Sequence, residues 1–161
     1  MVLLSPSFSN GQSRILKFEH IQTDAGLSQS NVLSILQDSR GFMWFGTRDG
    51  LNKYDGYKFT VYRNDPKTPG TISNDYINDI IESRDGNLWI ATWGGGLNCF
   101  DRQKGNFTYY KYNPKDPKSI SSNFITSIQE DKKGNLWIGT ESGGLNMMDQ
   151  KTKIFKHFRN N

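Results

Sequence analysis

Few side chains of this 161-residue sequence have a type and spacing that would support covalent chemistry or metal binding. The two histidines, His20 and His157, have no cysteine, aspartate or glutamate at the spacing of a metal-ligand motif. Cys99 is the single cysteine, which excludes an internal disulfide and a cysteine-based zinc site. No Ser-His-Asp arrangement and no phosphate-binding glycine loop can be assembled. The sequence therefore predicts no catalytic residue, no metal and no cofactor.

A second group of residues stands out because it follows one short pattern at three places and differs in chemistry each time. A threonine precedes these residues and a Gly-Leu-Asn triplet follows them; they are Arg48 and Asp49, Trp93, and Glu141 and Ser142. A constant frame with variable tips is how a repeat scaffold carries specificity. These tips are candidates for binding a small ligand, and Trp93, next to three glycines, is the sharpest candidate because its ring could stack on a sugar ring. The alternative is that Trp93 packs on a neighbouring loop.

Three further polar residues are candidates for the same ligand. Ser30, Asp75 and Asn123 stand at equivalent positions, each shortly before the first predicted strand of a repeat. Their side chains could supply hydrogen bonds beside the variable tips.

The frame that positions these residues is a threefold repeat with a period of roughly 45 residues. Gly41-Phe-Met-Trp44-Phe-Gly46-Thr47 recurs as Gly86-Asn-Leu-Trp89-Ile-Ala91-Thr92 and as Gly134-Asn-Leu-Trp137-Ile-Gly139-Thr140. A period of this size, built from short strands, is typical of a β-propeller blade. We expect Trp44, Trp89 and Trp137 to pack between blades, and Asp38, Asp85 and Asp131 to form turns rather than act as acids.

The predicted fold is all-β, with three four-stranded antiparallel propeller blades at about 27–62, 72–112 and 120–158. The predicted strands are 32–37, 43–47, 51–54 and 58–62 in the first blade, 77–82, 88–92, 97–100 and 107–112 in the second, and 125–130, 136–140, 145–148 and 154–158 in the third. An extra strand is expected at 15–20. Residues 1–14 are interpreted as the remnant of a secretory leader or as a disordered tail. Since four to eight blades close a ring, three predict an incomplete ring or closure by oligomerisation.

Composition narrows the classes of partner. The net charge is +4, but the lysines and arginines are spread over turns and strand edges, which favours a solvated surface over a nucleic-acid groove. No run approaches the roughly 18–20 apolar residues of a membrane span. We expect no contact with nucleic acid and none with membrane by this segment.

One long segment resembles a known family. Gly26-Leu-Ser-Gln-Ser-Asn31, followed by Ile35-Leu-Gln-Asp38-Ser-Arg-Gly41-Phe-Met-Trp44-Phe-Gly46-Thr47-Arg-Asp49-Gly50-Leu51-Asn52-Lys-Tyr54-Asp55-Gly56, resembles the two-component regulator propeller repeat. The resemblance covers about 15–161 and implies the N-terminal part of the periplasmic sensor of a hybrid two-component histidine kinase. In that family, further blades, an immunoglobulin-like domain, a membrane span and a kinase follow. None of these is present here, so any kinase activity would belong to another part of such a protein.

Three functions are compatible with these features. The first is a ligand-sensing segment of a periplasmic sensor, which the resemblance implies binds a carbohydrate breakdown product and which does no chemistry itself. The second is a stand-alone interaction scaffold that closes by self-association. The third, and weakest, is a propeller hydrolase or lyase. The expected partners are a small ligand such as an oligosaccharide, and either further blades of a longer chain or other copies of this one.

Overall fold

The computed structural model describes residue 18 and residues 20–159. The predicted leader remnant or tail at 1–14 lies outside these residues, as does most of the predicted extra strand at 15–20. The described part begins with a short 3-10 helix, η1 (Thr23–Ala25), and continues with strands only.

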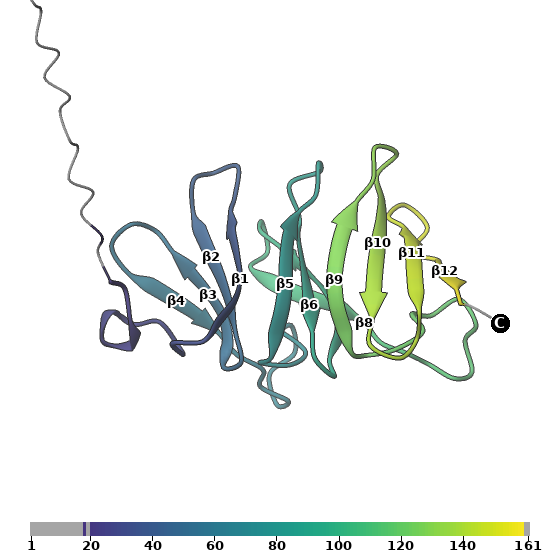
Figure 1. Ribbon diagram of the computed structural model, residues 1–161, viewed down its shortest axis with the longest axis horizontal. Helices are drawn as coiled ribbons and strands as arrows, with labels where there is room; N and C mark the ends of the chain where they lie inside the picture. The colour runs from purple at the N-terminus through teal and green to yellow at the C-terminus, as the bar shows by residue number, and fades with distance from the viewer. Residues whose placement is uncertain (1–17, 19, 160–161) are drawn as a thin grey trace, which may run out of the picture.

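Within the described residues, twelve strands form three separate four-stranded antiparallel sheets that stand side by side (Figure 1). Each sheet contains four consecutive strands in chain order, so each is one propeller blade. Blade 1 contains β1 (Val32–Gln37), β2 (Met43–Thr47), β3 (Gly50–Tyr54) and β4 (Phe59–Tyr62); blade 2 contains β5 (Ile77–Glu82), β6 (Leu88–Thr92), β7 (Gly96–Asp101) and β8 (Asn106–Tyr110); blade 3 contains β9 (Ile125–Glu130), β10 (Asn135–Thr140), β11 (Leu145–Asp149) and β12 (Phe155–Phe158). The predicted fold is confirmed, and the three sheets do not close into a ring.

The first strands β1, β5 and β9 lie next to one another along the inner side of the array (Figure 1). Side chains of β5 tie it to β9: Asn78 Nδ2 donates to the Ile125 carbonyl over 2.7 Å, and the Ile128 N–H donates to Asp79 Oδ2 over 2.8 Å. These bonds satisfy edge groups that a sheet would otherwise leave unpaired.

A buried asparagine on the third strand of each blade holds the loop that enters that blade. Its Oδ1 accepts the backbone N–H of a serine at 2.9–3.0 Å, and its Nδ2 donates to the hydroxyl of the same serine at 2.8 Å. The pairs are Asn52 with Ser28, Asn98 with Ser73, and Asn146 with Ser121. All three asparagines are fully buried. We call this contact the asparagine–serine lock; it explains why Gly-Leu-Asn and the upstream serine recur together.

The glycine before each Leu-Asn pair is required by the backbone. Gly96 has φ of 81°, and Gly50 and Gly144 also have positive φ. A Cβ on any of the three would collide with a carbonyl oxygen of the fourth strand, that of Tyr110 in the case of Gly96. Only glycine combines this conformation with so close an approach.

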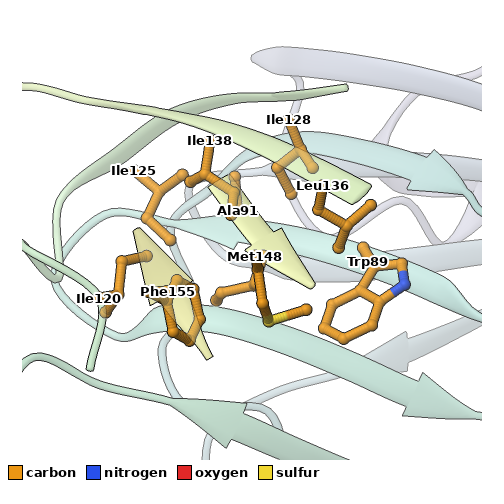
Figure 2. Packing of buried hydrophobic residues seen from close by; sticks show 10 residues of the cluster. Trp89, Ala91, Ile120, Ile125, Ile128, Leu136, Ile138, Met148 and Phe155 are labelled. Atoms are coloured by element: carbon orange, nitrogen blue, oxygen red, sulfur yellow. The ribbon is translucent and has the colours of Figure 1, made fainter. Parts of the chain in front are cut away.

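The hydrophobic core lies between the blades. Trp44 of blade 1 packs into a buried cluster formed mainly by blade 2, and Trp89 of blade 2 does the same against blade 3. Figure 2 shows the second cluster, which contains Trp89, Ala91, Leu97, Ile120, Ile125, Ile128, Leu136, Ile138, Met148 and Phe155. Each fully buried aliphatic or aromatic side chain contributes about 1.5–3 kcal/mol. Packing between blades is therefore the main source of stability.

We call the blade face that carries this tryptophan the forward face, because it contacts the next blade, and the opposite one the rear face. Trp44 and Trp89 are buried as predicted, with exposed fractions of 1% and 0%. Trp137, on the forward face of blade 3, is only half-buried, because no fourth blade covers it within residues 18–159.

The turn between the first and second strands orients each tryptophan. The indole N–H donates to Asp38 Oδ2 in blade 1 at 2.8 Å and to Asp131 Oδ2 in blade 3 at 3.0 Å. In blade 2 the equivalent acceptor is the Ser83 hydroxyl, at 3.1 Å from the indole of Trp89. Asp85 forms a turn as predicted, but it lies two residues after the position that Asp38 and Asp131 occupy, where it accepts the Asn87 N–H.

Substitution Asn98→Ala tests the asparagine–serine lock. It leaves the Ser73 N–H and hydroxyl without their buried partner, so we expect the free energy of unfolding to fall by about 2–3 kcal/mol. Urea unfolding followed by circular dichroism measures the change. Asn106→Ala, at an exposed position on β8, is the control and should stay within about 0.5 kcal/mol of the wild type. Equal stability of the two variants would show that the lock is not structural.

Candidate functional site

The predicted tips lie at one end of the blades. The turns between the second and third strands and the crossovers between blades share this end, below the sheets in Figure 1. The turns between the first and second strands are at the other end. The structure brings Arg48 and Trp93 to one stretch of this surface, across the boundaries between blades.

Trp93 is the centre of a row of aromatic side chains. Its ring lies 6.0 Å from the ring of Tyr76 and 5.3 Å from the ring of Phe124, measured between centroids. The backbone N–H of Trp93 donates to the Tyr76 carbonyl over 2.9 Å, and the Trp93 backbone forms an antiparallel β-bridge with Phe124 of blade 3. We call Tyr76, Trp93 and Phe124 the aromatic row. Tyr76 and Trp93 are half-buried, and Phe124 is 42% exposed.

The alternative that Trp93 packs on a neighbouring loop is observed, and its stacking on a sugar ring stays a prediction. The side chain packs on Tyr76 of its own blade and on Phe124 of the next, and it remains half-buried. Arg48 extends the row, since its guanidinium lies 5.2 Å from the centre of the Tyr76 ring. This is the distance of a cation–π contact. Within the described residues Arg48 has no carboxylate at ion-pair distance.

The other predicted residues have varied surroundings. Asp49 forms an exposed ion pair with Arg63 at 2.8 Å. Asp75 Oδ1 accepts the Asn64 N–H, and Asn123 Oδ1 accepts the Tyr112 N–H, so both side chains hold the preceding crossover. The strand β8 was predicted to reach residue 112 but ends at Tyr110. The Tyr112 N–H donates to the Asn123 side chain and not to a neighbouring strand, which explains the difference.

Glu141, Ser142 and Ser30 are exposed at the two ends of the array. The backbone N–H of Glu141 donates to the Phe124 carbonyl over 3.0 Å, which places Glu141 beside the aromatic row. Ser30 belongs to the entrance of blade 1, where the residue that follows it is Asn31 instead of an aromatic one.

Two members of the row, Tyr76 and Phe124, were missed from the sequence. Both immediately precede the first strand of their blades, one residue after Asp75 and Asn123. The sequence did contain a signal for them: Asn31, Tyr76 and Phe124 occupy the same position of the three repeats, and the residue type at that position differs between repeats. We did not select these positions because tyrosine and phenylalanine are common in strands and therefore look like part of the strand that follows.

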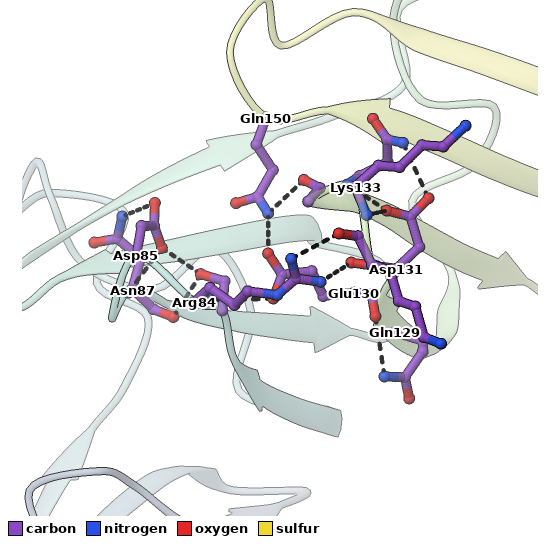
Figure 3. A network of polar contacts seen from close by, with 12 residues as sticks. Arg84, Asp85, Asn87, Gln129, Glu130, Asp131, Lys133 and Gln150 are labelled. Atoms are coloured by element: carbon purple, nitrogen blue, oxygen red, sulfur yellow. Dashed lines mark hydrogen bonds and ion pairs between the residues drawn. The ribbon is translucent and has the colours of Figure 1, made fainter.

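The opposite end of the blades carries polar grooves. One of about 430 Å³ lies between blades 2 and 3 and is lined by Arg84, Glu130, Lys133, Gln150 and neighbours. In Figure 3 Arg84 reaches from blade 2 to the backbone of blade 3, where it donates to the carbonyls of Asp131 and Lys132. Gln150 Nε2 donates to Glu130 Oε1 and to the Gly134 carbonyl. Because the polar groups that line the groove are hydrogen-bonded to one another, we interpret them as a structural contact that holds blades 2 and 3 together, and we call this contact a clamp.

The equivalent clamp between blades 1 and 2 is built around Arg102. This side chain is only 6% exposed, and its Nη2 lies 3.3 Å from Asp38 Oδ2 and 3.1 Å from Glu82 Oε1. Arg102 and Gln150 stand at equivalent positions after Asp101 and Asp149. Because the guanidinium is paired with two carboxylates from both blades, its charge is neutralised within the junction.

His157 and Cys99 belong to residue types that often take part in catalysis, but here His157 contacts a backbone carbonyl and the Cys99 thiol is largely buried. His157 contacts the Ser119 carbonyl through Nε2 at 2.7 Å. Burial raises the pKa of the Cys99 thiol to about 11, so the reactive thiolate is scarce at neutral pH. Across residue 18 and residues 20–159, no three His, Cys, Asp or Glu side chains are grouped to hold a metal ion. In the same part of the chain, no helix has the length and apolar character that crossing a bilayer requires.

The blades, their junctions and the aromatic row define a β-propeller segment with three neighbouring aromatic rings at its loop tips. The family model described as "two component regulator propeller" matches the chain three times, at residues 26–49, 71–94 and 119–142. Each match runs from the loop that enters a blade to the turn that follows its second strand. The chain therefore contains three two-component regulator propeller repeats.

Known proteins with similar sequence or structure agree with this assignment. The extracellular domain of the hybrid two component system BT3049 from B. thetaiotaomicron is 34% identical, with a TM-score of 0.82 over 88% of this chain and 20% of that one. Histidine kinase P4 of Formosa agariphila is 58% identical over 48 residues, which are 30% of this chain and 4% of that protein. A virginiamycin B lyase from Staphylococcus aureus is 19% identical, with a TM-score of 0.58 over 84% of this chain and 45% of that one, and shares the fold alone. The chain thus spans a fifth or less of the two related signalling proteins.

Asp131, at the polar end of blade 3, makes stability depend on pH. Hydrogen bonds from the Asn135 side chain and from the Trp137 indole hold the pKa of its carboxyl well below the ordinary value of 3.8. The unfolded chain therefore takes up this proton first as the pH falls, so the stabilisation is complete above about pH 4 and is lost below it. We expect Asp131→Asn to be less stable at pH 7 and to lose less stability than the wild type between pH 5 and pH 3.

Urea unfolding at several pH values measures this effect. Asp24→Asn is the control, because Asp24 is exposed and accepts no side-chain hydrogen bond from the described residues. An Asp131→Asn variant with the acid dependence of the wild type would contradict the assigned role.

Proposed function

We propose that this chain is a ligand-sensing segment of the periplasmic propeller of a two-component sensor kinase, and that it performs no chemistry itself. The related BT3049 domain is extracellular and belongs to a hybrid two component system, which supports both the signalling role and a location outside the cytoplasm. The observation that carries the proposal is the aromatic row, which lies at the loop tips where the three blades differ.

The proposed ligand is a carbohydrate, such as an oligosaccharide. Sugar rings have faces of C–H groups that pack on aromatic rings. A row of three aromatic rings is long enough to contact more than one sugar unit. The hydroxyl groups of such a ligand need hydrogen-bond partners at the edge of the row. Arg48 and Glu141, at either end, are exposed and can supply them.

Binding at this surface would be coupled to blade packing. The N–H groups of Gly94 and Gly96 in blade 2 both donate to the Asn123 carbonyl at the entrance of blade 3, each over 3.0 Å. The turn that carries Trp93 is therefore fastened to the next blade. A ligand that contacts Trp93 and Phe124 spans the junction, and its binding would favour one relative position of the two blades.

The scaffold alternative is compatible with the same surface, since exposed aromatic residues also serve protein partners. A propeller hydrolase or lyase has less support, because His157 is engaged with a crossover carbonyl and is remote in sequence from the aromatic row. A metal-dependent activity lost in a His157→Ala variant would be needed to favour it.

Trp93→Ala tests the proposed site. Oligosaccharides prepared by partial hydrolysis of plant, algal and bacterial polysaccharides are the probes, and isothermal titration calorimetry measures binding. Because a stacked aromatic ring is lost, we expect the affinity for a bound oligosaccharide to fall about tenfold or more, which corresponds to about 1.4 kcal/mol.

Tyr57→Ala is the matched control, since this ring is 95% exposed on the hairpin between β3 and β4 of blade 1, outside the aromatic row. It should bind like the wild type. The proposal fails if no probe binds below a Kd of about 1 mM, or if both variants bind the same oligosaccharide equally well.

A further inference from the structure

A small cavity lies in the junction between blades 1 and 2, at the end of the blades opposite to the aromatic row. Its volume is about 170 Å³, and its apolar walls are the rings of Phe42, Trp44 and Tyr62 from blade 1 and of Phe100 from blade 2. Arg40 at its edge is exposed and Trp44 is 1% exposed, so the cavity reaches from the surface to the core. It has room for a six-membered ring, since an apolar cavity of about 150 Å³ can admit benzene.

The charges that line this cavity are mostly positive. The cations are Lys53 and Arg40 of blade 1 and Arg102 of blade 2, and the one carboxylate among the lining residues is Asp38. Glu82, the second ion-pair partner of Arg102, adds a further negative charge beside the cavity. Three positive charges thus meet two negative ones, and the excess favours a ligand with a single negative charge.

The Lys53 ammonium is held by aromatic rings and not by a carboxylate. Its Nζ lies 3.6 Å from the centre of the Phe42 ring and 5.8 Å from the centre of the Trp44 ring. Among the described residues, neither Lys53 nor Arg40 has a carboxylate at ion-pair distance. A cation–π contact attracts the charge but leaves N–H donors of the ammonium for an anion.

Arg102 also has donors that lack an acceptor. Its side chain is 6% exposed, and within the described part of the chain its Nε and Nη2 make no hydrogen bond. Nη2 lies at ion-pair distance from Asp38 and Glu82. These carboxylates already accept the Trp44 indole N–H and the Ser39 hydroxyl. Because buried polar groups are normally paired, the guanidinium has capacity for one more acceptor.

The junction between blades 2 and 3 shows what fills the corresponding space there. Lys153 stands at the position that Gly105 has in blade 2, and the two residues have similar φ values of 59° and 69°. The Nζ of Lys153 lies 5.0 Å from the centre of the Trp89 ring. A Cβ on Gly105 would meet no atom within 4 Å. The first junction therefore has a cavity where the second has a side chain.

The cations of the cavity are also confined to the first junction. Lys53, Arg40 and Arg102 are replaced at the second junction by Cys99, Asp85 and Gln150. The repeat keeps the tryptophan and changes the residues around it, as it does at the loop tips. A cavity with an excess of positive charge is thus a particular feature of this junction and not a requirement of the blade.

We propose that the cavity between blades 1 and 2 binds a small organic acid, with its carboxylate against Lys53, Arg40 and Arg102 and its apolar body between the aromatic rings. Charge-assisted hydrogen bonds hold the carboxylate, and the rings contribute apolar contact. The ligand touches both blades, so it stabilises their junction by mass action. The site is separate from the aromatic row, and the proposal does not depend on binding of a carbohydrate there.

Nuclear magnetic resonance titration of the isotope-labelled chain with benzoate tests the site. The reporters are the Trp44 indole N–H and the backbone amides of Arg40 and Phe42. We expect these signals to shift with a Kd of about 1 mM or lower. Benzamide has the same shape without the charge, so it should bind about tenfold more weakly or worse. Benzoate should also raise the unfolding midpoint, because it binds the folded chain.

Lys53→Met removes one cation and introduces the residue that blade 3 has at the equivalent position, Met147. The affinity for benzoate should fall about tenfold or more. Lys111→Met is the matched control, because the Lys111 ammonium also lies over an aromatic ring, 4.8 Å from the centre of Tyr109, but outside the cavity. This control should bind benzoate like the wild type.

Arg40→Gln provides a second variant that leaves the buried wall unchanged, since Arg40 is exposed. It should also weaken benzoate binding, and the dispersion of the amide signals verifies that each variant is folded.

The proposal is overturned if benzoate causes no shift of the Trp44 indole signal up to about 20 mM, if benzamide binds as tightly, or if the Lys53→Met and Lys111→Met variants bind benzoate equally well. Tighter binding of inorganic phosphate than of benzoate would also overturn it, since the cavity would then select an inorganic oxyanion and not an organic acid.

Discussion

A four-stranded sheet of this kind has two apolar faces and can bury neither of them alone. The structure depends on this constraint. Each blade places a tryptophan of its second strand against the rear face of the next blade, where aliphatic and aromatic residues surround it. The indole N–H is held by an aspartate or serine of the preceding turn, so the ring is fixed before the next blade packs on it. Stability is thus a property of junctions, as in other repeat proteins.

The junctions also explain where recognition can occur. The asparagine–serine lock fixes the loop that enters each blade, and the turn that carries Trp93 is bonded to the entrance of the following blade. These hydrogen bonds hold the backbone of the loop tips at this end in place, while the side chains of the tips differ from blade to blade. The aromatic row crosses from one blade to the next, so a ligand bound there would report on, and act on, the packing of the blades. Under the proposed function, such coupling would connect ligand binding with blade packing, which an isolated blade could not do.

Much of the fold could be predicted from the sequence because the repeat aligns three independent examples of each strand. Strands β1, β2, β5, β6 and β9 begin and end at the predicted residues. The roles of Trp44 and Trp89 followed from their positions between apolar neighbours, but the half-exposed Trp137 depends on what covers the last blade. Ser83 was overlooked as the acceptor of an indole N–H because Asp85, two residues later, looks more like Asp38 and Asp131. Tyr76 and Phe124 escaped notice because contacts across blades are long-range, and only the folded array brings them to Trp93.

Native-state hydrogen exchange on dilute protein, verified to be single chains, tests most directly whether junctions carry the stability. Among the described residues, blade 2 is covered on both faces, while blades 1 and 3 are each covered on one. The account predicts the slowest amide exchange in β5, β6 and β7, faster exchange in blades 1 and 3, and the fastest at the edge strand β12, where Phe158 is 46% exposed. Equal protection of the three blades, or faster exchange in blade 2 than in its neighbours, would contradict it.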